Sequence, residues 1–397
     1  SISRDFTFKP TIFDKNIFMF QNEYRQKNKN SLFITDFNIV DGYKSKKSDE
    51  KNTLTHFFSE YRLDLDFENF VESSLNFSLQ KVNNDTYLKV FDTNIVNTDL
   101  KPKNFDTLTS EIDFNLENEN FALKAGFTSY ENLSKRNSDR YQYVLPYFDF
   151  SRNFFDNNKF ASFDFFSQGD NILKDTNSLR SRMINNLNIQ SYDFISKNGL
   201  KNNLNYFLKN TISAGKNNAE YDSSPHVKLM GIFELTSSFP MINIDENYIN
   251  NFNPKVSLRI NPSDMKGYKT EKRQINSDNL FNVDRLGLID TLESGQNLTL
   301  GLDFKKEKIN NINKYFELKL GKVLRTQSNK NIPSNSTLDK RNSNYFGKII
   351  HNLNENINFN YEFSINHDLD QIQYNSLGTT ISMGNFVTKF NYIEEEG

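Results

Sequence analysis

The sequence contains no cysteine and no tryptophan, and only 8 of its 397 residues are proline and 15 are glycine. Without cysteine, this chain forms neither a disulfide framework nor a thiolate metal site. The low proline and glycine content excludes collagen-like and low-complexity structures. No stretch reaches the roughly 18 consecutive apolar residues of a transmembrane helix. An excess of one charge is missing too, because 48 Lys and Arg face 50 Asp and Glu, which argues against a nucleic-acid-binding protein.

Aromatic residues are abundant, with 38 Phe and 18 Tyr, although the mean hydropathy is low at −0.70. Disordered chains are poor in aromatic residues, whereas a β-sheet with one apolar and one polar face combines both properties. AT-rich codon usage would also enrich Phe, Ile, Asn and Lys without any selection on structure. The order of the residues is therefore more informative than their number.

Strict alternation of apolar and polar residues indicates strands with two different faces. Residues 356–366 show it clearly, because Phe359, Tyr361 and Phe363 would share one face while Asn358 and Asn360 would share the other. Residues 57–67 repeat the pattern. Helical spacing is hardly ever sustained beyond two turns, so we expect an all-β protein with essentially no helix.

This alternation predicts about nineteen strands, most of them about 9–15 residues long, close to the length of a tilted membrane-spanning strand. They are expected near residues 5–12, 16–26, 30–41, 53–66, 70–82, 106–116, 120–130, 139–151, 158–168, 175–192, 196–213, 225–238, 250–261, 295–305, 311–324, 341–350, 355–366, 370–383 and 386–394.

The connections between these strands mostly alternate between long and short. Transmembrane β-barrels have this asymmetry, with short periplasmic turns and longer extracellular loops, so we predict an antiparallel outer-membrane barrel with its first strand rising from the periplasm. A secreted solenoid or adhesin would show a fixed repeat, and none is found. Long connections are expected at 42–52, 83–105, 131–138, 214–224, 262–294 and 325–340, short ones at 67–69, 117–120, 193–195 and 306–310, and exceptions near 239–249 and 367–369.

Residues that could support catalysis or bind a cofactor do not cluster along the sequence. The four histidines, His56, His226, His351 and His367, are scattered and show no metal-binding spacing. His56 falls on the polar face of its strand, where we expect a solvated or interior-facing side chain. The sequence therefore predicts neither an enzyme nor a cofactor-binding protein.

Pro10 falls within or at the end of the first predicted strand. Proline cannot donate a hydrogen bond to a sheet and is mostly confined to edges and bulges. Either the strand ends at Pro10, or Pro10 weakens the seam between this strand and its neighbour. Phe6 and Phe8 alternate with polar residues and would give the strand an apolar face.

Several motifs resemble the barrel domain of the LptD family of lipopolysaccharide-assembly proteins, in order over about residues 5–305. The segment Asp5-Phe-Thr-Phe-Lys-Pro10, followed by Gln21-Asn-Glu-Tyr-Arg25, resembles the start of that domain. Residues 84–88 and 141–146 resemble two further segments, each with a one-residue difference in spacing. The most specific stretch begins at 253–256 and continues through a long loop, where Thr291 stands in place of a frequent Arg. The loop residues that match the family pattern are Asp278, Leu280, Phe281, Arg285, Gly287 and Asp290.

The resemblance implies transport of lipopolysaccharide and its insertion into the outer leaflet of the outer membrane, without catalytic residues. It further implies a barrel of about 26 strands with a lateral gate formed by the strand of Phe6, Phe8 and Pro10. An LptE-like lipoprotein would plug the barrel. A periplasmic bridge protein would deliver lipopolysaccharide through an N-terminal jelly-roll domain.

We expect residues 1–397 to be an incomplete barrel domain, without the jelly roll and the last strands. The chain starts at Ser1, and about nineteen is an odd count, whereas single-chain bacterial barrels have even counts. The family often has disulfides, which this chain cannot form. The alternatives are another outer-membrane transport barrel, such as a porin or nutrient receptor, and a secreted structural or adhesive β-protein.

Overall fold

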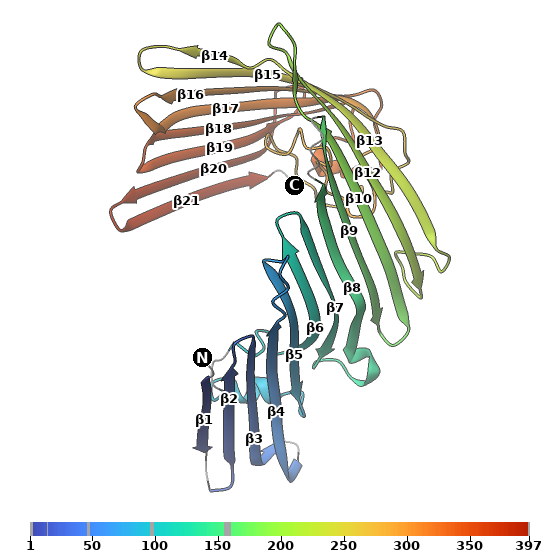
Figure 1. Ribbon diagram of the computed structural model, residues 1–397, viewed down its shortest axis with the longest axis vertical. Coiled ribbons are helices and arrows are strands. Elements are labelled where there is room, and N and C mark those ends of the chain that lie inside the picture. Colours follow the sequence, from blue (N-terminus) through green and yellow to red (C-terminus); the bar gives the residue numbers. More distant parts are fainter. Residues whose placement is uncertain (1–2, 14, 46–47, 96–98, 155–159, 396–397) are drawn as a thin grey trace. The chain divides into compact units, whose positions relative to one another are not determined.

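The computed structural model describes residues 3–13, 15–45, 48–95, 99–154 and 160–395. Within these ranges the chain forms a 21-stranded antiparallel sheet (Figure 1). The only helical elements there are α1 (Tyr87–Phe91) and two 3-10 turns, η1 (Asn137–Arg140) and η2 (Ser334–Ser336). No helix in the described part of the chain is long and apolar enough to cross a membrane. The predicted all-β class is confirmed.

All nineteen predicted strands are present. They are β1 (Ser3–Ile12), β2 (Phe18–Lys27), β3 (Ser31–Ser45), β4 (Ser48–Asp64), β5 (Glu72–Val82), β6 (Thr107–Asn118), β7 (Phe121–Asn132), β8 (Tyr141–Phe154), β9 (Ala161–Lys174), β10 (Ser178–Ser191), β12 (Lys201–Lys216), β13 (His226–Ser238), β15 (Tyr248–Asn261), β16 (Gly295–Lys308), β17 (Asn311–Arg325), β18 (Asn342–Asn354), β19 (Ile357–Ile365), β20 (Ile372–Met383) and β21 (Phe386–Glu395).

Two short strands were not predicted, β11 (Phe194–Ile195) and β14 (Met241–Ile244). β14 continues β13 beyond Phe239 and Pro240, because both strands pair with β15. Proline has no backbone N–H to donate, which explains a break at this point. The link near 239–249, expected as an exception to the alternation, is therefore shorter than predicted, and a turn at 245–247 joins β14 to β15.

The expected long loop at 42–52 is also wrong. β3 continues to Ser45 and β4 begins at Ser48, while residues 46–47 lie outside the described residues. The register shifts after Val40, next to Gly42, whose φ of +82° lies in the region that favours glycine. A bulge thus lets the hairpin extend where the alternation of side chains is lost.

The chain divides into two compact units. The first contains Ser1–Phe154, Phe165–Asn185 and Thr211–Val227, and the second contains Phe155–Asp164, Asn186–Asn210 and Lys228–Gly397. In the first unit, connections 83–106 and 133–140 lie at one end of the antiparallel strands and turn 119–120 at the other. In the second, connections 262–294 and 326–341 lie opposite turns 309–310 and 355–356. The predicted long and short alternation therefore holds at these connections, although it fails between β3 and β4.

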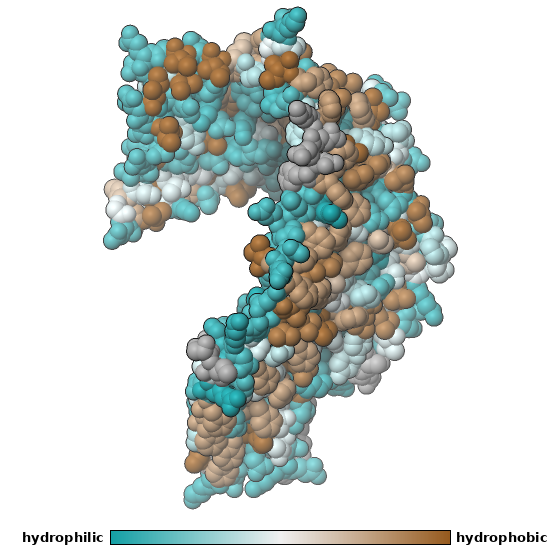
Figure 2. Space-filling model, in the orientation of Figure 1, coloured by the Kyte–Doolittle hydropathy of each residue, from teal (hydrophilic) through white to brown (hydrophobic). Residues whose placement is uncertain are grey.

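Strand register gives the first unit one apolar and one polar face. Phe37 pairs with Phe57, and Ile112 pairs with both Phe77 and Phe127. All five side chains are exposed, and we call their side of the sheet the apolar face. Figure 2 shows apolar side chains gathered over these N-terminal strands. Paired residues on the opposite, polar face include Asn38 and His56.

The second unit repeats this division. Leu258 pairs with Leu298 on the apolar face, whereas Arg259 pairs with Asn297 on the polar face. In β19, Tyr361 pairs with Ile349 and Leu377, so the predicted apolar face of residues 356–366 is correct. The buried apolar clusters lie on the polar faces, where the connections 83–106 and 262–294 fold back onto the strands.

Candidate functional site

The connection 262–294 packs against the polar face of β15–β18. Gly301 pairs directly with Gly321 in the neighbouring strand, which leaves a shallow slot without side chains. A Cβ atom on Gly301 would lie 2.5 Å from the ring of Phe281, and one on Gly321 would collide with Leu280. Leu280 and Phe281 thus fit the slot because both opposing residues are glycine.

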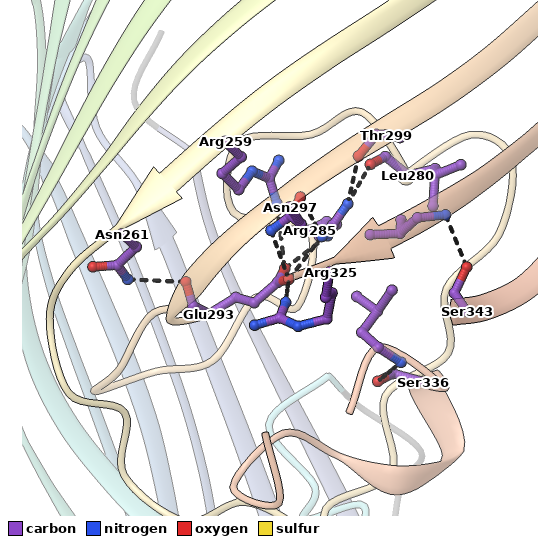
Figure 3. Close-up of polar contacts among 12 residues, drawn as sticks. Arg259, Asn261, Leu280, Arg285, Glu293, Asn297, Thr299, Arg325, Ser336 and Ser343 are labelled. Carbon is purple, nitrogen blue, oxygen red and sulfur yellow. Dashed lines mark hydrogen bonds and ion pairs between the residues drawn. The ribbon is translucent and has the colours of Figure 1, made fainter. Parts of the chain in front are cut away.

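Arg285 holds the middle of this connection against the sheet through several hydrogen bonds. Its Nε and Nη2 atoms donate to the two carboxylate oxygens of Glu293, each at 2.7 Å (Figure 3). The same guanidinium donates to Thr299 Oγ1 at 3.0 Å and to Asn297 Oδ1 at 3.1 Å, both on β16. A planar guanidinium suits such bidentate contacts. Arg285 therefore ties the connection to itself and to the sheet.

Glu293 is shared by three arginines. Arg259 of β15 approaches its Oε2 atom at 3.3 Å, and Arg325 of β17 donates to its Oε1 atom. Burial alone raises the pKa of the Glu293 carboxyl, but Arg285, Arg259 and Arg325 outweigh it and lower this pKa to about 2. Arg259 is also paired with Glu234 of β13 at 2.7 Å. We call Glu234, Arg259, Arg285, Glu293 and Arg325 the arginine cluster.

The remaining motif residues have other partners. Asp278 lies at the edge of the connection and pairs with Lys319 of β17 at 2.9 Å and with Lys348 of β18. Asp290 pairs with Lys266 inside the connection at 2.9 Å. Gly287 has a φ of +55°, and a Cβ atom added there would have nothing within 4 Å. Glycine is therefore favoured here by the positive φ of the turn and not by a close contact.

The structure thus brings Leu280, Phe281 and Arg285 into contact with the sheet. Asp278 lies at the edge of the connection, whereas Gly287 and Asp290 have their roles within it. Glu293, Arg259 and Arg325 were not predicted as site residues. The signal of the two arginines in the sequence is their place on the polar side of an alternating strand, because a buried charge must find a partner. Glu293 lies in the connection, where alternation gives no signal.

The described residues of connection 83–106, which are 83–95 and 99–106, cover the polar face of the first unit in a similar way. Tyr87 of α1 accepts a hydrogen bond from Asn38 Nδ2 at 2.6 Å, and its hydroxyl lies 2.8 Å from His56 Nδ1. His56 Nε2 lies 3.0 Å from Asp36 Oδ1, and the other oxygen of this carboxylate, Oδ2, accepts a hydrogen bond from Gln21 Nε2 at 3.0 Å. Burial raises the pKa of Tyr87. His56 lies on the predicted polar face but is 1% exposed, so of the two expectations the solvated side chain is wrong, and the interior-facing one stays a prediction.

β1 carries the three residues predicted for a lateral gate. Phe6 is 62% and Phe8 53% exposed, and Pro10 pairs with Phe20 of β2. The strand continues to Ile12, so the alternative that it ends at Pro10 is wrong. Lys9 points to the other face and donates to the backbone oxygen of Asn94 in connection 83–106 at 3.2 Å.

Two comparisons with known proteins bear on these features. The model of one protein family, described as LPS transport system D (LptD), matches residues 46–396. No curated protein matches the chain. Within the described ranges, no three acidic or histidine side chains are grouped so that they could hold a metal ion.

Proposed function

The chain belongs to the LptD family of lipopolysaccharide transport, and from this premise we propose that it forms part of an outer-membrane barrel that inserts lipopolysaccharide into the outer leaflet. The family match over residues 46–396 is the observation that carries the proposal. The transfer is physical, so it requires no catalytic residue. An LptE-like lipoprotein inside the barrel and a periplasmic bridge protein are the partners in this proposal.

The two faces of the sheet suit this task. Exposed apolar side chains such as Phe359 and Leu300 provide the surface that acyl chains of the membrane require. Their polar counterparts on the other face, such as Asn358 and Asp303, exchange hydrogen bonds readily with water and with sugar hydroxyls. A molecule with acyl chains and sugars therefore finds a matching surface for each part.

We place the lateral opening along β1. Every side chain of β1 except the half-buried Thr11 is exposed, and Phe6 and Phe8 offer apolar contacts to acyl chains. Pro10 lacks one N–H, and a backbone hydrogen bond contributes about 0.5–1.5 kcal/mol net. A seam that lacks a few such bonds opens thermally, whereas a fully paired seam stays closed.

The experiment compares two strand prolines in the full-length protein, expressed in cells depleted of the native copy. Pro10→Ala restores an N–H in β1 and should slow the appearance of lipopolysaccharide at the cell surface. Pro254→Ala is the matched control, because Pro254 lies inside β15 and pairs with Leu302. Heat-modifiable mobility on gels checks folding. If folded Pro10→Ala delivers lipopolysaccharide at the normal rate, Pro10 has no role in the lateral opening. If depleted cells without any complementing copy still deliver lipopolysaccharide normally, the proposed function is wrong.

A labelling experiment tests the orientation independently. The chain has no cysteine, so a single introduced cysteine is the only thiol in this region. Cysteines in connections 133–140 and 326–341 should react with an impermeant thiol reagent on intact cells. Cysteines in turns 119–120 and 309–310 should react only after the outer membrane is opened. The reverse pattern would contradict a periplasmic start of β1.

A further inference from the structure

The second unit contains a polar cavity of about 410 Å³ on the polar face of β10, β12, β13 and β15, beside Phe281. Ligand pockets typically measure about 300–1,000 Å³, so the cavity has room for a small ligand. Apart from Glu234, it is lined by residues that the arginine cluster does not use. The family-motif residue Phe281 forms its apolar wall.

Neutral amides dominate the lining. Asn202, Asn203, Asn205 and Asn253 come from two strands that are not neighbours, β12 and β15, and Gln190 comes from β10. The side-chain oxygens of Asn205 and Asn253 are shielded from solvent and accept no hydrogen bond within the described part of the chain. Shielded carbonyl oxygens without a donor are unfavourable, so a ligand that donates hydrogen bonds would be stabilised there.

The charged residues of the cavity neutralise one another. Lys201 pairs with Asp193 at 2.7 Å, and Lys255 pairs with Asp303 at 2.8 Å. The remaining carboxylate, Glu234, is held by an arginine of the arginine cluster. Among the described lining residues, every cation that could bind a phosphate and every carboxylate that could bind an amine already has a partner. This neutrality indicates an uncharged ligand.

A sugar ring has the chemistry that these groups require. Its hydroxyls donate and accept hydrogen bonds and so match amides, which also do both, while its C–H groups pack against an aromatic side chain. We propose that the cavity beside Phe281 binds a neutral sugar unit of the oligosaccharide of lipopolysaccharide during its passage. This inference rests on the proposed function and adds a defined binding site to it.

Phe281 links the cavity to the connection 262–294. Its ring packs over Gly301, and the ammonium of Lys255 lies 4.3 Å from the ring centre. The wall of the sugar site is therefore fixed only while the connection stays attached. A cavity with fixed amides and a fixed ring needs little rearrangement on binding.

The test measures binding of oligosaccharide cut from the host's lipopolysaccharide by mild acid, using saturation-transfer NMR on the purified full-length protein in detergent. The double variant Asn205→Ala, Asn253→Ala should weaken binding about tenfold, which corresponds to about 1.4 kcal/mol. Phe281→Leu should weaken it too, while keeping an apolar side chain over the glycine pair. Asn360→Ala is the matched control, because Asn360 also has a shielded oxygen without a donor but lies outside the cavity, on β19.

The site is supported if the cavity variants lose affinity for the oligosaccharide while Asn360→Ala keeps it. Equal affinity of all folded variants overturns it, as does displacement of the sugar by inorganic phosphate. Failure of the wild-type protein to bind the oligosaccharide also overturns it. Surface delivery of lipopolysaccharide is measured separately, so this failure together with normal delivery would leave the proposed function intact.

Discussion

Replacing Glu293 with glutamine should detach connection 262–294 from the sheet. The substitution keeps the shape of the side chain but leaves Arg259, Arg285 and Arg325 with one carboxylate, Glu234, among them. Breaking a buried ion pair by removing one partner costs about 3–5 kcal/mol. The fall of the pKa of Glu293 from 4.5 to about 2 has the same cause and the same order of magnitude, about 3 kcal/mol.

The assay follows opening of the connection through a buried cysteine. Ser277→Cys is nearly isosteric, and Ser277 is 8% exposed. If labelling by a soluble thiol reagent follows the open population, a loss of about 3 kcal/mol should raise the labelling rate about 100-fold. Lys348→Gln, measured in the same background, removes one ion pair of the more exposed Asp278 and should raise it less than about fivefold.

Two outcomes would refute this reasoning. Equal labelling rates in Glu293→Gln and the unsubstituted background would show that the arginine cluster does not hold the connection. A rate for Lys348→Gln as high as that for Glu293→Gln would show that any lost ion pair opens the connection, so burial would not be the reason. Heat-modifiable mobility of each variant confirms that the strands remain folded.

The same cluster predicts the effect of pH. The folded pKa of Glu293 is lowered, so its contribution to attachment is complete above the unfolded value of 4.5 and is lost as pH falls toward about 2. Labelling of the Ser277→Cys variant should therefore be constant from neutral pH down to about 5 and should rise below it, after correction for the reagent's own pH dependence. Adding Glu293→Gln to this variant should abolish the acid step.

Three further predictions follow from the two faces and the packed connections. Tyr361→Arg should impair folding by roughly 2–4 kcal/mol when it faces lipid near the bilayer midplane, whereas Asn360→Arg should be tolerated, as heat-modifiable mobility will show. Gly301→Ala should displace Phe281 and make connection 262–294 sensitive to protease. Unchanged digestion would show that Phe281 does not need a glycine at position 301. Tyr87→Phe should leave buried polar partners without a hydrogen bond, at a cost of about 1–3 kcal/mol in stability, and expose connection 83–106 to protease. Protease resistance equal to wild type would show that the Tyr87 hydroxyl does not hold this connection.

The strands and their faces follow from the order of the residues alone. Side chains of a strand alternate between its two faces, so apolar residues at every second position mark one face, and residues 356–366 could be assigned correctly without any structure. The long and short connections and the family motifs were also visible, because both depend on residues close together in the chain. Bulges and breaks were not, and the alternation failed at Gly42 and Pro240 for that reason.

The contacts of the long connections depend on how the strands pair and could not be predicted from local sequence. Glu293 meets Arg259 and Arg325 because β15, β16 and β17 pair in one register, and no local pattern encodes that meeting. Tyr87 reaches His56 and covers it for the same reason, whereas the sequence alone left His56 as either a solvated or an interior-facing side chain. Side chains far apart in the sequence find their partners through the sheet, so their contacts and burial follow from strand register and loop packing rather than from local sequence.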